Sequence, residues 1–340
     1  MDCNFTKITT LCISTMIVML VAFSCKHNSD GNSASEKSTI LETQGIDVLK
    51  RRMVNLGIYP AHWDGCYNFD KMNSTLAVFE DVQKLFAPNG KFMFPKHLQV
   101  KFFCDLYGGG SYVANRMEVG FRIKVSDTVF IDPSITRFAV AHEYGHAIFD
   151  VLMSQKNAVY RDHFASKIKF FTLRDEIEAL VKEDSRSPRI NQLISQSQQI
   201  IAGRSPQVAK IYDLLLPYNE LFADVIGVLY AGDGNAMSQV VAEDKEVRDF
   251  TKDLDMDKWQ RTDSYGAMAP ARSKIGKVFG LNHRNVKLKH PTEFVLSVIQ
   301  SIDRLFEEEK MLSAPGYQLN ETNVGRANER LVELIRQEYR

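Results

Sequence analysis

The sequence DPSITRFAVAHEYGHAIFDVLM, residues 132–153, decides the fold. It opens with Asp132, Pro133 and Ser134, a capping side chain followed by a proline in the first turn, which is typical of a helix start. Apolar side chains then recur at the spacing of one helical face. The stretch therefore predicts a long helix from about 133 to 153.

The residues before this helix follow a period of two instead. Leu98–Phe103 predicts a strand, and apolar residues alternate with polar ones through 120–132, where Ser126 and Asp127 supply a turn between two short strands. The glycine run 108–110 is interpreted as a loop. A small antiparallel sheet is therefore expected just ahead of the long helix.

The residues after the helix are mainly helical. The pairs Ser187-Pro188 and Ser205-Pro206 predict helices over 188–202 and from 206 onward. Pro217 is expected to kink or restart the second of these, which should end at the glycines near 232. The predicted fold class is α+β, mainly helical, with a small antiparallel sheet followed by a pair of long helices.

Composition excludes some partners. The chain has 340 residues, of which 44% are hydrophobic and 25% charged, within the range of ordinary globular proteins. Lys+Arg and Asp+Glu both total 42, so there is no excess of basic residues to neutralise phosphates. Nucleic acid is therefore not an expected partner.

The N-terminus has the pattern of an export signal. Lys7 precedes an uncharged apolar run, Ile8–Phe23, which ends at Ser24 and Cys25. This resembles a bacterial lipoprotein signal, although Ala22 stands where that pattern prefers Leu. The resemblance implies a signal over 1–25, a lipid on Cys25 as membrane anchor, and a place in the bacterial cell envelope. An uncleaved membrane anchor and a cleaved, secreted chain are the alternatives.

The organisation of the rest of the chain follows from this signal. Residues 26–45 are polar and rich in Ser, Asn, Lys and Glu, as in a solvated tether. Residues 46–340 are expected to fold, with a core at about 98–300. Of the cysteines in this folded part, Cys66 and Cys104 could pair in an oxidising compartment or remain buried thiols, and the sequence leaves both open.

The long helix carries the motif HExxH as His142, Glu143, and His146. Four residues of helix advance about 6 Å and turn about 400°, so both imidazoles share one face and can reach one metal ion. Glu143 is rotated by about 100° from His142, which sets its carboxylate beside the open metal position. This is where a base that deprotonates a bound water must lie.

A catalytic zinc site usually takes three protein ligands, so the motif needs another. The best candidates are Glu220 and Asp224, two acids at i and i+4 in an otherwise apolar helix. Acids on a core-facing helix are costly unless they coordinate or pair. We expect Glu220 on the metal and Asp224 accepting the second ring N–H of a ligand histidine. A solvated acidic edge is the alternative.

These residues resemble the gluzincins, zinc peptidases with HExxH on one helix and ExxxD on a second. Glu220-Leu221-Phe222-Ala223-Asp224 looks most like the ExxAD form of the periplasmic and membrane-associated peptidases related to the CAAX prenyl endopeptidases. Glu220 lies 74 positions after His146, a long gap, as in that group. The resemblance covers about 129–300, lacks that family's multiple membrane spans, and matches nothing before about residue 98.

The resemblance implies a zincin active-site helix pair, a zinc cofactor and hydrolysis of peptide or protein substrates by an endopeptidase. In that group a His-Pro pair often lies near the site, so His290 would donate to the oxyanion, with Tyr265 a second candidate. A helix-start His-Pro without catalytic task is the alternative for His290. The competing functions are a non-catalytic, chaperone-like zinc-binding lipoprotein and a metal-storage or sensing protein. His163 and His283 are expected to be solvated.

Overall fold

The computed structural model describes residues 36–87, 92–107, 110–124, 126, 128–240, 245–308 and 317–339. The predicted signal, the lipidation site Cys25 and residues 26–35 of the tether lie outside these ranges. The chain divides into two units, Met1–Gln44 and Gly45–Arg340. The described part of the first unit is the beginning of helix α2 (Glu36–Asn55), so residues 36–45, predicted as tether, are helical. Everything below concerns the second unit.

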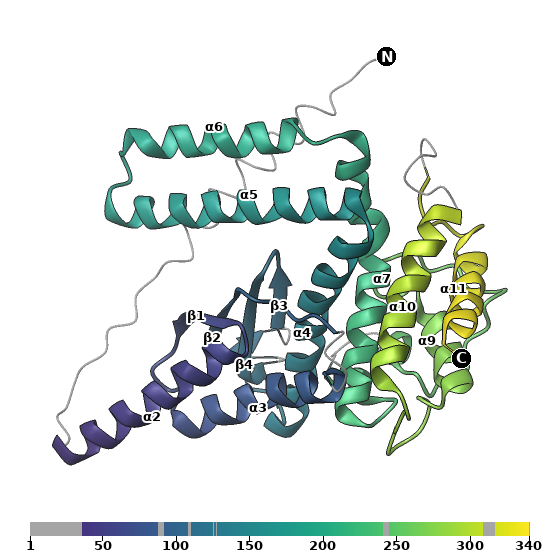
Figure 1. The fold of residues 1–340 in the computed structure, drawn as a ribbon, viewed down its shortest axis with the longest axis horizontal. Coiled ribbons are helices and arrows are strands. Elements are labelled where there is room, and N and C mark those ends of the chain that lie inside the picture. Colours follow the sequence, from purple (N-terminus) through teal and green to yellow (C-terminus); the bar gives the residue numbers. More distant parts are fainter. Residues whose placement is uncertain are drawn as a thin grey trace. The chain divides into compact units, whose positions relative to one another are not determined.

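A small mixed sheet forms the N-terminal part of this unit (Figure 1). Its strands are β1 (Ile58–Trp63), β2 (Leu98–Tyr107), β3 (Gly110–Val113), β4 (Arg116–Lys124) and β5 (Phe130–Ile131). The order is β1-β2-β4-β3, with β5 also paired to β4. The strands β1, β2 and β4 are parallel neighbours, whereas β3 and β5 run antiparallel to β4. The α+β, mainly helical class is confirmed, but the sheet is mixed and not purely antiparallel.

The reason for the parallel pairing is the way the chain reaches β2. Helix α3 (Phe69–Phe86) lies between β1 and β2 in the sequence, and a crossover helix lets the two strands run in the same direction. The sequence analysis did not assign a strand to the segment before α3, so it missed β1, the parallel partner of β2. The hairpin of β3 and β4 then places β3 at the end of the strand order.

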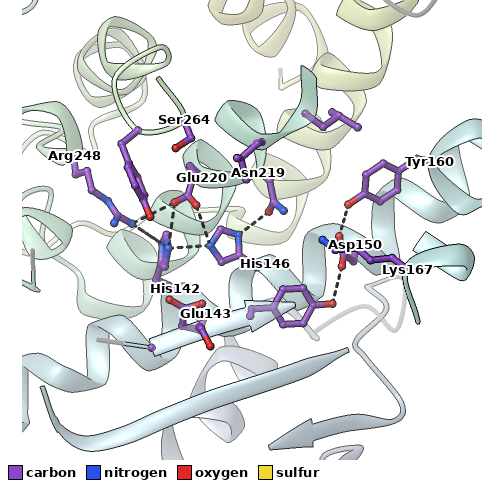
Figure 2. Close-up of a pocket in the computed structure, with 16 residues that line it drawn as sticks. His142, Glu143, His146, Asp150, Tyr160, Lys167, Asn219, Glu220, Arg248 and Ser264 are labelled. Atoms are coloured by element: carbon purple, nitrogen blue, oxygen red, sulfur yellow. Dashed lines mark hydrogen bonds and ion pairs between the residues drawn. The ribbon is translucent and has the colours of Figure 1, made fainter. Parts of the chain in front are cut away.

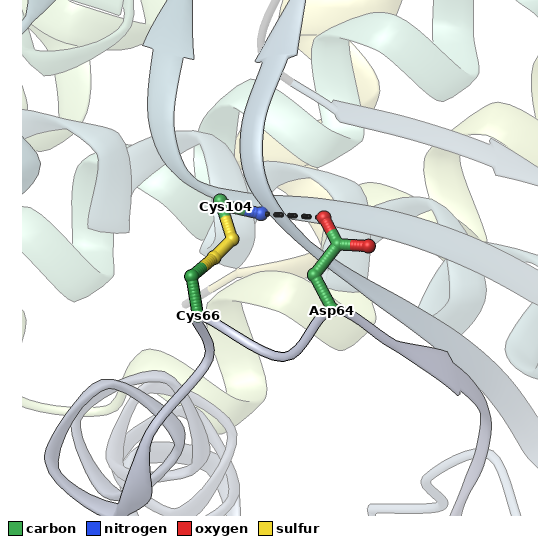
Figure 3. A group of neighbouring side chains, drawn as sticks. All are labelled: Asp64, Cys66 and Cys104. Atoms are coloured by element: carbon green, nitrogen blue, oxygen red, sulfur yellow. Dashed lines mark hydrogen bonds between the residues drawn. A yellow bond between two sulfur atoms is a disulfide. The ribbon is translucent and has the colours of Figure 1, made fainter. Parts of the chain in front are cut away.

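A disulfide joins Cys66 to Cys104 and ties the loop after β1 to strand β2 (Figure 3). Their Cα atoms lie 6.1 Å apart, within the normal range for a disulfide. Asp64 belongs to the same group, because its carboxylate accepts a hydrogen bond of 3.1 Å from the backbone N–H of Cys104. Of the two states that the sequence left open, the structure shows the pair.

Helix α4 (Pro133–Lys156) contains HExxH and packs against β3, β4, α3 and α7. It begins as predicted, with the Asp132 carboxylate accepting from the Ser134 N–H at 2.7 Å and Pro133 in the first turn. At its other end, Asn157 terminates α4 and at the same time caps the next helix, accepting from the Tyr160 N–H at 3.0 Å. A single residue therefore sets the break between two long helices.

Helices α5 (Ala158–Glu183) and α6 (Pro188–Ala202) form an antiparallel hairpin, seen side by side in Figure 1. The bounds of α6 are those that Ser187-Pro188 predicted. The next helix, α7 (Pro206–Ala231), runs without interruption through Pro217 and ends at Gly232, whose φ of 65° is the left-handed conformation typical of a helix end. The predicted restart at Pro217 is therefore wrong, although the end of the helix is confirmed.

The remaining described helices complete the C-terminal part. They are α8 (Ala236–Val240), the 3-10 helix η1 (Lys245–Arg248), α9 (Ala269–Phe279), α10 (Pro291–Glu308) and α11 (Val324–Glu338). One segment of the described residues, Asp213–Ala231 in α7, is long and apolar enough to cross a bilayer, but 78% of it is buried within the protein. That degree of burial is typical of a core helix.

Helices α4 and α7 come close together at Gly145. A Cβ atom at this position would lie 2.9 Å from the Cα of Ala223, which is too close for any other residue without a shift of one helix. Gly145 stands between His142 and His146 in sequence, and Ala223 stands between Glu220 and Asp224. The small residues of the two motifs therefore bring the two sets of polar side chains face to face.

Candidate metal centre

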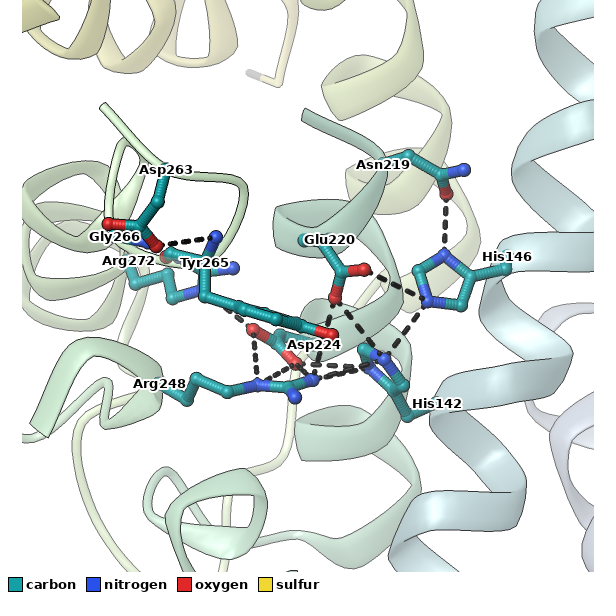
Figure 4. Close-up of polar contacts among 10 residues, drawn as sticks. All are labelled: His142, His146, Asn219, Glu220, Asp224, Arg248, Asp263, Tyr265, Gly266 and Arg272. Atoms are coloured by element: carbon teal, nitrogen blue, oxygen red, sulfur yellow. Dashed lines mark hydrogen bonds and ion pairs between the residues drawn. The ribbon is translucent and has the colours of Figure 1, made fainter. Parts of the chain in front are cut away.

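Three buried side chains from α4 and α7 converge on one point, shown in Figures 2 and 4. The Nε2 atoms of His142 and His146 lie 3.0 Å apart. Glu220 faces both, with Oε2 at 3.5 Å from His142 Nε2 and Oε1 at 3.6 Å from His146 Nε2. The structure thus brings together the three residues that the sequence predicted as metal ligands.

These spacings can be compared with the requirements of zinc. Tetrahedral zinc with bonds of about 2.1 Å needs ligand atoms about 3.4 Å from one another. The three observed separations, 3.0, 3.5 and 3.6 Å, are close to that value. In addition, Glu220 Oε2 is buried and accepts no hydrogen bond of ordinary geometry from the described residues. The donor set of two imidazoles and a carboxylate therefore fits a zinc ion.

The outer nitrogen of each histidine is held by a residue of α7 (Figure 4). His142 Nδ1 lies 3.0 Å from Asp224 Oδ1, so Asp224 lies behind this candidate ligand and not among the three converging atoms. His146 Nδ1 lies 2.8 Å from Asn219 Oδ1. An acceptor on Nδ1 fixes the tautomer that leaves Nε2 free to coordinate. Asn219 was missed by the sequence analysis, although it directly precedes Glu220.

Two arginines surround Asp224, and neither was found from the sequence. Arg272 of α9 is fully buried and donates from Nε to Asp224 Oδ2 at 2.7 Å. Arg248, at the end of η1, donates from Nε to both oxygens of Asp224 at 3.1 and 3.3 Å. Burial raises the pKa of Asp224, but the two guanidiniums more than offset it and hold the pKa well below its usual range. Asp224 is therefore a fixed negative charge.

The charges around Asp224 also shift the pKa values of His142 and Glu220, two of the three candidate ligands. Burial and the Arg248 guanidinium lower the pKa of His142, whereas the Asp224 and Glu220 carboxylates raise it, and the net result is a pKa of about 9. Burial raises the pKa of Glu220, but the two histidines and Arg248 lower it to about 2. The two carboxylates thus stabilise positive charge at the three converging side chains. A divalent cation and the proton on His142 would compete for this position.

Glu143 and Tyr265 lie at the same pocket without belonging to the ligand trio. Glu143 lines it from α4, and the backbone of Gly110 on β3 passes so close that a Cβ there would lie 2.7 Å from Glu143 Cγ. Tyr265 is 45% exposed, and its ring lies over the Arg248 guanidinium at 5.2 Å. Its carbonyl accepts from Arg272 Nη1 at 2.8 Å, which anchors the loop that carries it.

His290 requires a correction. It is exposed, directly precedes α10, and its carbonyl accepts from the Phe294 N–H at 3.1 Å as part of the first helical turn. It does not line the pocket around His142, whereas Tyr265 does. The alternative reading of the His-Pro pair, a helix start without catalytic task, agrees with this position. The oxyanion assignment to His290 is therefore withdrawn.

The pocket has a volume of about 330 Å³ and extends well beyond the three ligands (Figure 2). Arg248 lies at one end, where the Tyr265 ring packs on it, and Asp150, Tyr160 and Lys167 lie past His146 at the other, where Tyr112 is bonded to Asp150. His163 is close to this second end and is buried at 3% exposure, so the prediction that it is solvated is wrong. His283 is exposed, as expected.

In comparisons with known proteins, no family model, no curated protein and no solved structure matches this chain. The resemblance to the gluzincins therefore depends on the two motifs, and the function is argued from the geometry of the site.

Proposed function

We propose that this protein is a zinc-dependent peptidase in which His142, His146 and Glu220 hold the metal. The observation that carries the proposal is the convergence of these three side chains at separations of 3.0 to 3.6 Å. They come from two helices that meet at Gly145, so the arrangement is set by the packing of the core. A bound zinc ion would supply a Lewis acid for the scissile carbonyl and make a water molecule acidic enough to attack it.

Glu143 is the general base of the proposed reaction. It is adjacent to His142 in sequence, lines the pocket and is not among the ligand atoms, so its carboxylate is available to accept a proton from the attacking water. The same carboxyl group then delivers the proton to the leaving amine. The contact with Gly110 restricts its side chain between α4 and β3.

The negative charge that develops on the carbonyl oxygen needs hydrogen-bond donors. Tyr265 and Arg248 lie together on the pocket wall, and Arg248 Nη2 reaches to 3.8 Å from Glu220 Oε2. The hydroxyl of Tyr265 and the guanidinium of Arg248 are the donors that we assign to this role. A substrate backbone would lie along β3, the last strand in the order, whose residues Gly110, Ser111 and Tyr112 line the pocket.

The proposed location is the bacterial cell envelope, with a lipid anchor on Cys25. The Cys66–Cys104 disulfide supports it, because disulfides persist in oxidising compartments outside the cytoplasm. Metabolic labelling with a fatty acid analogue would test the anchor, and a Cys25→Ser variant should lose the label and the membrane association.

Two substitutions test the proposed activity. Glu143→Gln should keep zinc and fold but lose hydrolysis of casein by several orders of magnitude, because the base is removed and the ligands are not. Glu220→Ala should lower the zinc content sharply, because one of three ligands is lost. Zinc is measured by atomic emission, hydrolysis with and without a chelator, and folding by circular dichroism.

The matched control is Glu246→Gln, which changes an exposed glutamate of η1 two residues from Arg248. It should leave the zinc content and the rate of hydrolysis unchanged. An undiminished rate in Glu143→Gln would remove Glu143 from the mechanism. Zinc bound by the wild-type chain without any peptide hydrolysis would favour the alternative function, a non-catalytic zinc-binding or chaperone-like lipoprotein.

A further inference from the structure

Glu143 differs from the other polar side chains of the site in the way it is held. The imidazoles of His142 and His146 each have an acceptor on Nδ1, and Asp224 accepts from two arginines. Within the described residues, by contrast, the Glu143 carboxylate forms no hydrogen bond or ion pair. Its position in the pocket, seen in Figure 2, is therefore determined by the groups that pack against it.

Gly110, the first residue of strand β3, packs directly against this side chain. A Cβ atom at Gly110 would lie 2.7 Å from Glu143 Cγ and 3.3 Å from Glu143 Cδ. The carbonyl oxygen of Glu118 would also be 3.3 Å away, a contact that a shift of a few tenths of an ångström relieves. The contact with Glu143 Cγ is much closer, so a side chain at position 110 would require Glu143 to move.

The backbone itself does not require glycine at this position. Glycine is favoured where φ lies in the left-handed region, as at Gly57, Gly232 and Gly280. Gly110 is not in that region and lies in a strand paired with β4, a conformation that alanine also adopts. What excludes a Cβ atom from this position is therefore the side chain of Glu143.

Strand β3 is fixed on both sides, so it does not readily move aside. It is paired with β4 over its whole length. Two residues after Gly110, on the same side of the strand, the Tyr112 hydroxyl donates to Asp150 Oδ2 at 2.7 Å. Asp150 follows Glu143 by about two helical turns and lies on the same face of α4. An added methyl group at Gly110 would therefore displace the Glu143 side chain and not the strand.

We propose that Gly110 is a positioning residue, whose missing side chain sets the place of the Glu143 carboxylate beside the metal site. The inference rests on the proposed peptidase function, in which Glu143 is the base, and adds the element that positions this base. With a methyl group at Gly110, the 2.7 Å contact would have to lengthen to the ordinary 3.4 Å or more. A base must lie about 2.6–3.2 Å from the proton donor, and a misplacement of about 1 Å costs on the order of 100-fold in rate.

The experiment compares kcat and KM for one casein-derived peptide in the zinc-loaded wild type and in Gly110→Ala. The variant should lose about 10-fold to 100-fold in kcat with KM within about 2-fold, because the base is displaced and the ligands are not. Its zinc content should be unchanged. Gly65→Ala is the matched control, since a Cβ atom at Gly65 would have no atom within 4 Å, and it should alter neither constant. An unchanged kcat, or a loss confined to KM, in Gly110→Ala would overturn the proposal.

A second background separates displacement of the base from a general disturbance of the strand. Glu143→Gln has no base, so adding Gly110→Ala to it should lower the residual kcat by less than about 2-fold. The same factor of loss in both backgrounds would show that the methyl group acts without Glu143, and the positioning role would be overturned.

Failure of the peptidase function itself is recognised separately, because the contact is also measured without turnover. Thermal midpoints are recorded in excess chelator for the wild type, Gly110→Ala, Glu143→Ala and the double variant. Glu143→Ala removes Cγ and Cδ, so the shift caused by Gly110→Ala should be less favourable by about 2 °C or more when Glu143 is present. Equal shifts in the two backgrounds would overturn the positioning role. A difference between them, in a wild type that cleaves no peptide, would support the contact and refute only the peptidase function.

Discussion

A buried aspartate lies at or behind each end of the pocket, and the two carboxylates have opposite surroundings, with charged donors around one and neutral donors around the other. Asp224, at the metal end, accepts hydrogen bonds from Arg248 and Arg272 and has a pKa well below its usual range. Asp150 lies at the other end, which is lined by Tyr112, Asp150, Tyr160 and Lys167 and which we call the distal wall. It accepts from two tyrosine hydroxyls. Burial raises the pKa of Asp150, and Lys167 and the tyrosines offset only part of that effect.

The comparison shows that burial alone does not determine the charge of an acid in this protein. Guanidiniums compensate the loss of water around Asp224, whereas neutral hydroxyls satisfy the hydrogen bonds of Asp150 without supplying charge. A permanent anion behind His142 suits a centre that binds a cation. The raised pKa of Asp150 means that this carboxyl group holds its proton to a higher pH than Asp224 does.

Among substitutions that distinguish Asp224 from Asp150, we expect Asp224→Asn to have the largest effect on the free energy of unfolding. Removing this charge leaves Arg248 and Arg272 buried beside a neutral amide, and breaking a buried ion pair in this way costs about 3 to 5 kcal/mol. The free energy of unfolding is measured with urea at pH 7 in excess chelator, so that metal affinity does not contribute. A loss below about 1 kcal/mol would mean that the arginines do not depend on Asp224.

A double variant checks the cause of that loss. Arg272→Met removes one of the two cations that Asp224→Asn leaves uncompensated, and Met fills a similar buried volume. The double variant should therefore be less destabilised than the sum of the two single variants, by about 1 kcal/mol or more. Additive losses would contradict an electrostatic origin.

The metal end is the part of the site that the sequence predicts well, because its residues lie at fixed spacings on helices. His142, His146, Glu220 and Asp224 follow the i, i+4 rule, and helix geometry alone brings each pair to one face. Arg248 and Arg272 lie on separate elements whose packing no local pattern reveals. For Arg272 the signal in the sequence is weak, an arginine directly after Ala269, Pro270 and Ala271. For Arg248 there is no signal.

The distal wall was not predicted at all, because it depends on three elements that meet only in the folded chain. Helix α5 was not assigned from the sequence, since its apolar residues are spread around its circumference and only Tyr160 and His163 are buried. The strand β1 was missed because Pro60 and His62 interrupt its alternation. A half-exposed helix and an irregular strand both lack the periodicity that sequence analysis detects.

A smaller effect, with a distinctive pH dependence, is expected from Asp150→Asn. The variant should lose about 1 to 2 kcal/mol near pH 4, because an amide cannot accept from both tyrosines as a carboxyl group does. Above the unfolded pKa, near 3.8, the unfolded chain has released the Asp150 proton while the folded chain retains it. Wild-type stability therefore falls relative to the variant as pH rises towards the raised, folded pKa.

The measurement is a set of urea denaturation curves for both chains from pH 4 to pH 8. Taking the difference between them removes the contributions of every other titrating group. A wild-type advantage that grows with pH would show that Asp150 has a lowered pKa like Asp224, and the contrast between the two ends of the pocket would disappear.

The smallest effect concerns the hydrogen bond between Tyr112 and Asp150. Tyr112→Phe should cost about 1 kcal/mol at a pH where Asp150 is protonated, because the lost bond then joins neutral groups. In a series from pH 4 to pH 8 the cost should rise towards about 2 kcal/mol as Asp150 ionises, because an ionised carboxylate then loses a donor and bonds to charged groups are stronger. Tyr67→Phe is the matched control, since the Tyr67 hydroxyl is buried against the neutral hydroxyl of Thr75 at 2.5 Å. Its cost should not change between these pH values. A Tyr112 cost as flat as that of Tyr67 would mean that Asp150 keeps one charge state throughout this range.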